Sequence, residues 1–178
     1  MARNIPPGIL RSEFGFQRWN DYDAELWKKI LDVAKAGIKE KLDFPITGID
    51  KSYHVLDIAK QNAMIAGVSA DIDFRSQPFE DYTPKSEPGT IITNPPYGGR
   101  ITDRSQDLFV LYENIGNILK QRFSGWTAWV FTANQDAAKH VGLKPSRKIP
   151  LYNGPLECRL LKYEMYAGSK KVHKNIQP

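Results

Sequence analysis

The chain has 178 residues, of which 41% are hydrophobic and 25% charged, with a formal net charge of +5. This composition is typical of a globular protein and argues against a collagen-like, disulfide-rich or intrinsically disordered chain. No apolar run approaches the roughly 20 residues that cross a bilayer, and the single cysteine cannot form an internal disulfide. We therefore expect no membrane partner and a reducing, cytoplasmic location.

A basic segment closes the chain. Residues 168–178 contain three lysines and no acid, and we predict a disordered tail there, following one domain over residues 1–167. The isoelectric point near 9.2 is compatible with a nucleic-acid partner. A solvated tail that only aids solubility would explain the same charge, so charge alone does not decide the function.

Helices and strands are expected to alternate along the chain. In chain order, the apolar spacing predicts a helix over 21–41, a strand over 46–50, a helix over 55–66, strands over 72–75 and 90–93, a helix over 108–119, a strand over 126–132, a helix over 135–140, and strands over 148–152 and 157–166. Asn20 is the predicted cap of the first helix. This order predicts an α/β fold whose sheet is mostly parallel, with an antiparallel C-terminal hairpin at one edge.

Asp50 stands directly after the first predicted strand. In open α/β sheets, ligands bind beyond the carboxyl ends of the strands, where an acid can accept hydrogen bonds from both hydroxyls of a ribose. The same residue can instead cap the following helix, with Ser52 as a rival cap. Asp50 alone leaves both interpretations open.

A second polar segment, Asn94-Pro95-Pro96-Tyr97, follows the strand predicted over 90–93. An exocyclic amine of a nucleic-acid base is a poor nucleophile because its lone pair is delocalised into the ring. The side-chain oxygen of Asn94 and the carbonyl of Pro95 can accept both amine hydrogens, which localises that lone pair, and the prolines fix the direction of the carbonyl. Tyr97 can stack on the base. The segment therefore predicts methyl transfer to an amine, against the alternative of a proline-rich turn with a packed tyrosine.

Neighbouring residues can contact the substrate backbone. Gly98 and Gly99 leave room for its close approach, and Arg100 can pair with a phosphate. Arg147 and Lys148 can contact RNA phosphates, or they can line a solvated edge. No histidine has a spacing with Cys158 that is typical of metal ligands, so we predict no metal site.

These motifs, in this order, resemble the catalytic domain of S-adenosylmethionine-dependent ribosomal RNA guanine-N2 methyltransferases, which usually also carry a THUMP domain. The matching segments are residues 2–8, 14–19, 48–50, 94–100 and 143–160. The last is the most discriminating and points away from DNA adenine methyltransferases, which share only the Asn-Pro-Pro-Tyr loop. The resemblance implies a Rossmann-like methyltransferase fold, S-adenosylmethionine as cofactor and ribosomal RNA as partner. It places Asp50 on the cofactor ribose and Asn94 at both the cofactor and the target base.

The chain departs from the family pattern in two places. The family's first motif, a central strand followed by a glycine-rich loop, and its THUMP domain have no counterpart in the sequence. We expect the resulting gap in the sheet to close by direct pairing, to be filled by another chain or an upstream segment, or to loosen the fold. In addition, Gln77 replaces an acid that the family tends to place at the cofactor adenine, and it can accept the same hydrogen bond.

Two other functions remain open. The departures would suit a catalytically incomplete fragment, or an RNA-binding module without a cofactor. An enzyme that methylates an amine of DNA or of a protein glutamine would also use the loop at Asn94, although the resemblance over residues 143–160 argues against it.

Overall fold

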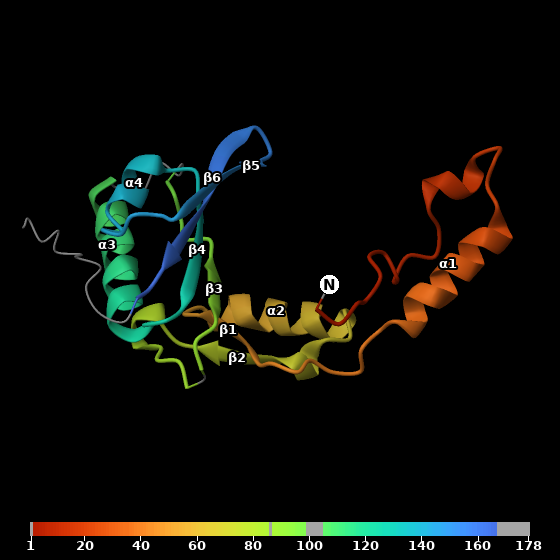
Figure 1. Ribbon diagram of the computed structural model, residues 1–178, viewed down its shortest axis with the longest axis horizontal. Coiled ribbons are helices and arrows are strands. Elements are labelled where there is room, and N and C mark those ends of the chain that lie inside the picture. Colours follow the sequence, from red (N-terminus) through yellow and green to blue (C-terminus); the bar gives the residue numbers. More distant parts are fainter. Residues whose placement is uncertain (1, 86, 99–104, 167–178) are drawn as a thin grey trace, which may run out of the picture. The chain divides into compact units, whose positions relative to one another are not determined.

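The computed structural model describes residues 2–85, 87–98 and 105–166, and the chain divides into two compact units, Met1–Phe79 and Glu80–Pro178. The helices are α1 (Ala24–Ala36), α2 (Tyr53–Ile65), α3 (Ser105–Arg122) and α4 (Gln135–Lys139). The strands are β1 (Ile46–Asp50), β2 (Ile72–Ser76), β3 (Thr90–Thr93), β4 (Thr127–Thr132), β5 (Arg147–Asn153) and β6 (Leu156–Glu164). Short 3-10 helices are η1 (Gly15–Arg18), η2 (Ser69–Asp71) and η3 (Phe79–Asp81). The predicted alternation of helices and strands is confirmed (Figure 1).

The first unit is built around one β-α-β crossover. Strands β1 and β2 are parallel, with Asp50 in register with Ser76, and α2 connects them and packs against both. Helix α2 begins after Ser52, whose hydroxyl accepts a hydrogen bond from the amide of Val55 at 3.4 Å. Two parallel strands end at the same edge of a sheet, so the residues that follow β1 and β2 meet there.

The start of α1 differs from the prediction. Asp23, not Asn20, caps this helix, because the carboxylate of Asp23 accepts a hydrogen bond from the amide of Leu26 at 2.9 Å. Asn20 lies in a turn closed by a hydrogen bond from the amide of Tyr22 to the carbonyl of Trp19. The extended backbone of Asp23 is typical of a helix N-cap. Because the chain first makes this turn, the helix begins three residues later than predicted, with Asp23 as its cap.

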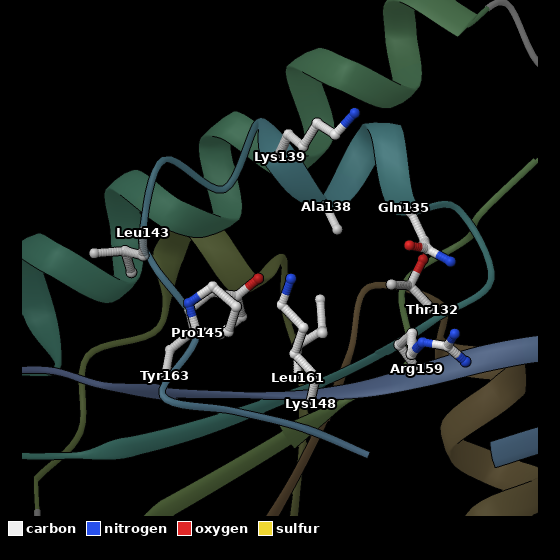
Figure 2. A pocket seen from close by; sticks show the side chains of 10 residues that line it. All are labelled: Thr132, Gln135, Ala138, Lys139, Leu143, Pro145, Lys148, Arg159, Leu161 and Tyr163. Carbon is white, nitrogen blue, oxygen red and sulfur yellow. The ribbon is translucent and has the colours of Figure 1, made fainter. Parts of the chain in front are cut away.

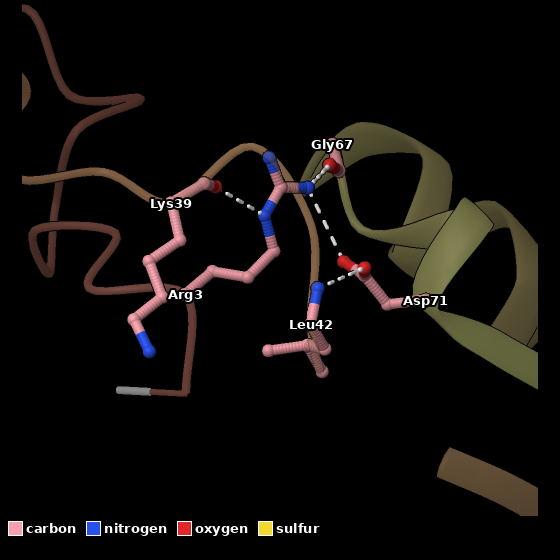
Figure 3. A network of polar contacts seen from close by, with 5 residues as sticks. All are labelled: Arg3, Lys39, Leu42, Gly67 and Asp71. Atoms are coloured by element: carbon pink, nitrogen blue, oxygen red, sulfur yellow. Dashed lines mark hydrogen bonds and ion pairs between the residues drawn. The ribbon is translucent and has the colours of Figure 1, made fainter. Parts of the chain in front are cut away.

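The N-terminal segment is joined to the first unit by the side chain of Arg3 (Figure 3). Its guanidinium donates hydrogen bonds to the carbonyls of Lys39, at 2.8 Å, and Gly67, at 3.0 Å, and forms an ion pair with Asp71 at 3.2 Å. The other carboxylate oxygen of Asp71 accepts a hydrogen bond from the amide of Leu42. The Arg3 and Asp71 side chains are 17% and 6% exposed, so solvent screens this pair less than an exposed one.

The second unit is a sheet with strand order β3-β4-β6-β5. Strand β3 is parallel to β4, whereas β6 is antiparallel to both β4 and β5, so the predicted C-terminal hairpin is confirmed with β5 at the edge. Helices α3 and α4 lie on the same side of this sheet (Figure 1). The largest fully buried side chains of the unit are Tyr112, Leu119, Phe123, Val130, Val141 and Tyr163.

Strands β1 and β3 each have one open edge within the described ranges. In the first unit β1 pairs with β2 alone, and in the second unit β3 pairs with β4 alone. Ile92 of β3 is 76% exposed. The three outcomes expected for the gap in the sheet therefore remain predictions.

None of the helices within the described residues is both long enough and apolar enough to span a bilayer. The predicted tail, residues 168–178, lies outside the described residues.

Replacing Gly116 by alanine is expected to destabilise the second unit. Gly116 lies in α3, and a Cβ atom there would collide with the backbone carbonyl of Val141. Alanine favours a helix by about 1 kcal/mol over glycine, but overpacking against backbone costs about 1–3 kcal/mol or more. We therefore expect Gly116→Ala to lower the free energy of unfolding by about 1–2 kcal/mol in urea titrations. Gly15→Ala, which has open space around its Cβ position, is the control, and equal stability of the two variants would contradict this packing.

Candidate functional site

The first group of predicted site residues lies at the carboxyl ends of β1 and β2. The amide of Gln77 donates a hydrogen bond to the carbonyl of Asp50 at 3.1 Å, which holds the two residues side by side. The Oδ1 atom of Asp50 accepts a hydrogen bond from the amide of Ser52 at 2.7 Å. Since the Ser52 hydroxyl caps α2, the interpretation of Asp50 as the helix cap is wrong. The Oδ2 atom of Asp50 has no hydrogen-bond partner in the part of the chain that the structure describes, so it remains available to a ligand.

The second group lies after β3, in the other unit. The Asn94 side chain is exposed and makes no hydrogen bond with the described residues, whereas Pro95 is buried and Pro96 is exposed. A buried proline with a fixed φ anchors this turn and leaves the neighbouring Asn94 amide directed to solvent or ligand. Gly98 has a φ of +82°, a conformation that favours glycine at the end of the described part of the loop.

Tyr97 is fixed by three contacts with other elements of the second unit. Its hydroxyl accepts a hydrogen bond from the Asn153 side chain at 2.7 Å, and its carbonyl accepts one from the Asn134 side chain at 3.3 Å. Its ring meets Phe131 edge-on, with ring centroids 6.5 Å apart. The position of the tyrosine ring is therefore set by β4, β5 and the loop before α4 together.

A buried hydroxyl pair supports the loop after β4. The hydroxyls of Tyr112 and Thr132 lie 2.6 Å apart, and both residues are fully buried. Thr132 also accepts a hydrogen bond from the amide of Asn134 at 3.0 Å. Burial raises the pKa of the Tyr112 phenol, more than its hydrogen bond to Thr132 lowers that pKa. The phenol therefore stays protonated at neutral pH and keeps this hydrogen-bonded pair intact.

Tyr97 and Gly98 open onto a cavity of about 360 Å³. Asn134, Gln135 and Leu156 are among its other lining residues. This volume falls within the usual range for small-ligand sites, about 300–1,000 Å³. The cavity is wide open to solvent, so it offers space beside Tyr97 that a ligand can enter directly.

Other predicted residues are placed differently. Gly99 and Arg100 lie outside the described residues. Arg147 and Lys148 begin β5, and both are exposed. Lys148 lines a second cavity, discussed below, whereas Arg147 lines neither. The described residues contain no group of three or more His, Cys, Asp or Glu side chains arranged to hold a metal ion.

Asn134 and Asn153 were missed in the sequence as site residues. Asn134 has a detectable signal, since it follows β4 and so lies at the carboxyl edge of the parallel part of the sheet, as Asn94 does. Asn153 lies between the strands predicted over 148–152 and 157–166 and carries no such signal. Its contact with Tyr97 joins residues 56 positions apart, and no local pattern predicts such a contact.

Known proteins resemble the chain over most of its length. It is 43% identical over 163 residues to "Putative RNA methyltransferase slr0064" of Synechocystis sp., covering 92% of this chain and 42% of that protein. It is 36% identical to the "Ribosomal RNA large subunit methyltransferase K/L" of Allochromatium vinosum, covering 93% of this chain and 23% of that protein. The chain therefore spans less than half the length of these curated relatives.

A solved structure has the same fold. The crystal structure of SMU.472 complexed with SAH superposes with a TM-score of 0.83 at 26% identity, covering 94% of this chain and 44% of that one. The family model UPF0020, described as the RMKL-like methyltransferase domain, matches residues 1–162. The strand order, the loop at Asn94 and these similarities agree, and the chain belongs to the RMKL-like methyltransferase domain family.

Proposed function

We propose that this chain is the catalytic domain of a cytoplasmic enzyme that transfers the methyl group of S-adenosylmethionine to the 2-amino group of guanine in ribosomal RNA. The observation that carries the proposal is the loop after β3, in which the Asn94 amide has no partner among the described residues and lies near a tyrosine fixed by three contacts beside a cavity. Membership of the family and the names of the relatives support the reaction and the substrate class.

The residues at the ends of β1 and β2 fit the cofactor. The free Oδ2 of Asp50 can accept hydrogen bonds from the ribose hydroxyls, while its Oδ1 is held by the Ser52 amide. The Gln77 side chain, half-buried next to Asp50, can accept a hydrogen bond from the adenine amine. This donor and acceptor set matches a nucleoside, and the homologous SMU.472 is complexed with SAH.

The loop residues act on the target base. S-adenosylmethionine, when bound, supplies an electrophilic methyl group. The Asn94 side-chain oxygen and the Pro95 carbonyl accept hydrogen bonds from the guanine amine and direct its lone pair out of the ring. Tyr97 stacks on the base, which is flipped out or single-stranded. Catalysis in this scheme is mainly positioning and electrostatics, and Gly99, Arg100 and Arg147 contact the RNA backbone.

We also propose that the open edge of β1 and, in the other unit, the open edge of β3 each pair with a further strand, supplied by another chain or by a segment outside this sequence. The unpaired edges and the 76% exposure of Ile92 favour this partner, because an apolar strand edge left in water invites pairing. In that arrangement residues 1–167 belong to a methyltransferase domain.

Calorimetric titration of the 178-residue chain with S-adenosylmethionine tests the cofactor site first. Binding with one-to-one stoichiometry is expected, followed by transfer of labelled methyl groups to ribosomal RNA by the full-length protein. Transfer to DNA or to protein, with none to RNA, would contradict the substrate. RNA binding without any cofactor binding by the full-length protein would favour an RNA-binding module instead.

Replacing Asn153 by alanine is expected to lower the methylation rate about threefold to tenfold. The variant removes the hydrogen bond to the Tyr97 hydroxyl and so loosens the position of the ring. A neutral hydrogen bond contributes about 1 kcal/mol, which corresponds to this loss in rate. Tyr97→Phe should show the same loss, because it removes the other partner, and the double variant should add little to either single one. Steady-state kinetics of the full-length enzyme measure this, and additive losses would refute the coupling.

A further inference from the structure

A second cavity, of about 310 Å³, lies in the same unit between α4 and strands β5 and β6 (Figure 2). Gln135 lines both this cavity and the one beside Tyr97, so the two are neighbours. The Lys148 side chain rises from its strand toward α4, and the Arg159 side chain lies below Thr132 in this view (Figure 2). A ligand that occupies both cavities would therefore pass Gln135.

The cavity is cationic. Lys139, Lys148 and Arg159 line it, and no acidic side chain does. Lys139 forms an ion pair with Asp136 at 2.7 Å, and Arg159 forms one with Glu157. Lys148 has no acidic partner within the described residues. Unlike the charges of Lys139 and Arg159, its positive charge is therefore not neutralised by an ion pair and can attract an anionic ligand. Arg159 is 26% exposed at its side chain and its guanidinium has donors enough to serve a second acceptor.

The rest of the lining is apolar or neutral. Leu143, Pro145 and Leu161 provide carbon surface, and Tyr163 adds a phenol that is 1% exposed. Burial, and then the neighbouring Tyr112, raises the pKa of Tyr163 to about 12. No negative charge therefore forms in this lining at neutral pH. A cationic side chain beside an apolar surface can bind a ligand that carries both an anionic group and a planar ring.

We propose that this cavity holds the RNA nucleotide next to the methylated guanosine, with its phosphate on Lys148 and Arg159 and its base or ribose on the surface formed by Leu143, Pro145 and Leu161. The inference rests on the proposed function, because the neighbouring cavity then holds the target base. It assigns to Lys148 a specific nucleotide contact and to Arg159 a role in substrate binding.

Fluorescence anisotropy with a labelled 12-nucleotide single-stranded RNA tests the proposal. Lys148→Gln should weaken binding by the 178-residue chain about fivefold and reduce the slope of log affinity against log salt by about 0.7, the value for one phosphate contact on a single strand. Lys85→Gln removes the same charge from an exposed position of the same unit that lines neither cavity, and it should change affinity less than twofold. Arg159→Lys, which keeps the charge, should weaken binding less than Arg159→Gln.

Three results would overturn the proposal. The first is an equal loss of RNA affinity in the Lys148 and Lys85 variants, and the second is no RNA binding by the wild-type chain. The third is a labelled oligoglutamate peptide that binds as tightly as RNA and is weakened equally by Lys148→Gln, which would make the cavity an acidic-peptide site.

Titration of each variant with S-adenosylmethionine separates this test from the proposed function. If Lys148→Gln loses RNA affinity but neither the wild-type protein nor any variant binds cofactor, the methyltransferase function is refuted, and the cavity remains an RNA-phosphate site without a methylated neighbour. Normal methyl transfer with equal effects of the two lysine variants refutes the site alone.

Discussion

Replacing Asn94 by alanine in the full-length enzyme is expected to lower the rate of methyl transfer about 10³-fold. The Asn94 oxygen is one of two acceptors proposed to draw the lone pair of the guanine amine out of conjugation. Removing a preorganised group that acts on the transition state costs about 10²–10³-fold in rate. Asn94 is exposed and unpaired in the part of the chain described, so its loss should leave the free energy of unfolding within about 0.5 kcal/mol of the wild type.

The matched variant is Asn94→Asp, which keeps an acceptor oxygen at the same position. It should retain more activity than Asn94→Ala, whereas both variants should bind RNA and S-adenosylmethionine nearly as well as the wild type. Single-turnover kinetics at saturating cofactor separate the chemical step from binding. Normal turnover by Asn94→Ala would remove Asn94 from the mechanism, and an unfolded variant would be recognised by its circular dichroism.

Replacing Asp50 by asparagine is expected to raise the dissociation constant for S-adenosylmethionine about 30-fold. The amide still accepts the hydrogen bond from the Ser52 amide that holds the loop after β1. It loses the negative charge that would receive the ribose hydroxyls, and hydrogen bonds to charged groups contribute about 1.5–3 kcal/mol. Asp50→Ala should weaken binding further, because it also releases the Ser52 amide.

Asp73→Asn is the control for Asp50→Asn, since Asp73 lies on β2 of the same unit and pairs with the partly exposed Arg75. It removes the same charge away from the carboxyl ends of the strands. Calorimetric titration should give a wild-type dissociation constant for this control. Similar weakening by the two variants would indicate that total charge, and not the position of Asp50, determines cofactor affinity.

The sequence predicted the elements because each is defined by local physics. Apolar side chains at helical or alternating spacing select α2, α3 and β4, and the glycines and prolines around them end each element. The misplaced cap of α1 shows the limit of this reasoning. Asn20 and Asp23 are both good caps, and the choice depends on the turn closed between Trp19 and Tyr22.

The site residues also fall into those that the sequence predicted and those that it did not. Asp50 and Asn94 could be identified from the sequence because each follows a strand with a parallel neighbour, and the residues after parallel strands lie at the ligand-binding edge of their own sheet. Asn153 could not, since it reaches Tyr97 from 56 positions away and its alignment depends on the strand order β3-β4-β6-β5. Asn134 is marked in the sequence only as a residue that follows a strand, and its hydrogen bond to Tyr97, 37 positions away, also depends on that strand order.

The sequence by itself determined the α/β alternation, the hairpin formed by β5 and β6, and the polar residues that follow β1 and β3. Only the tertiary structure decided that Tyr97 is held from β5 and the α4 loop, and that Lys148 borders a cationic cavity next to Gln135. The physical reason is the distance along the chain over which each interaction acts. Backbone propensity and capping act within a few residues, whereas cavities and side-chain hydrogen bonds between strands exist only once the register of the sheet is set.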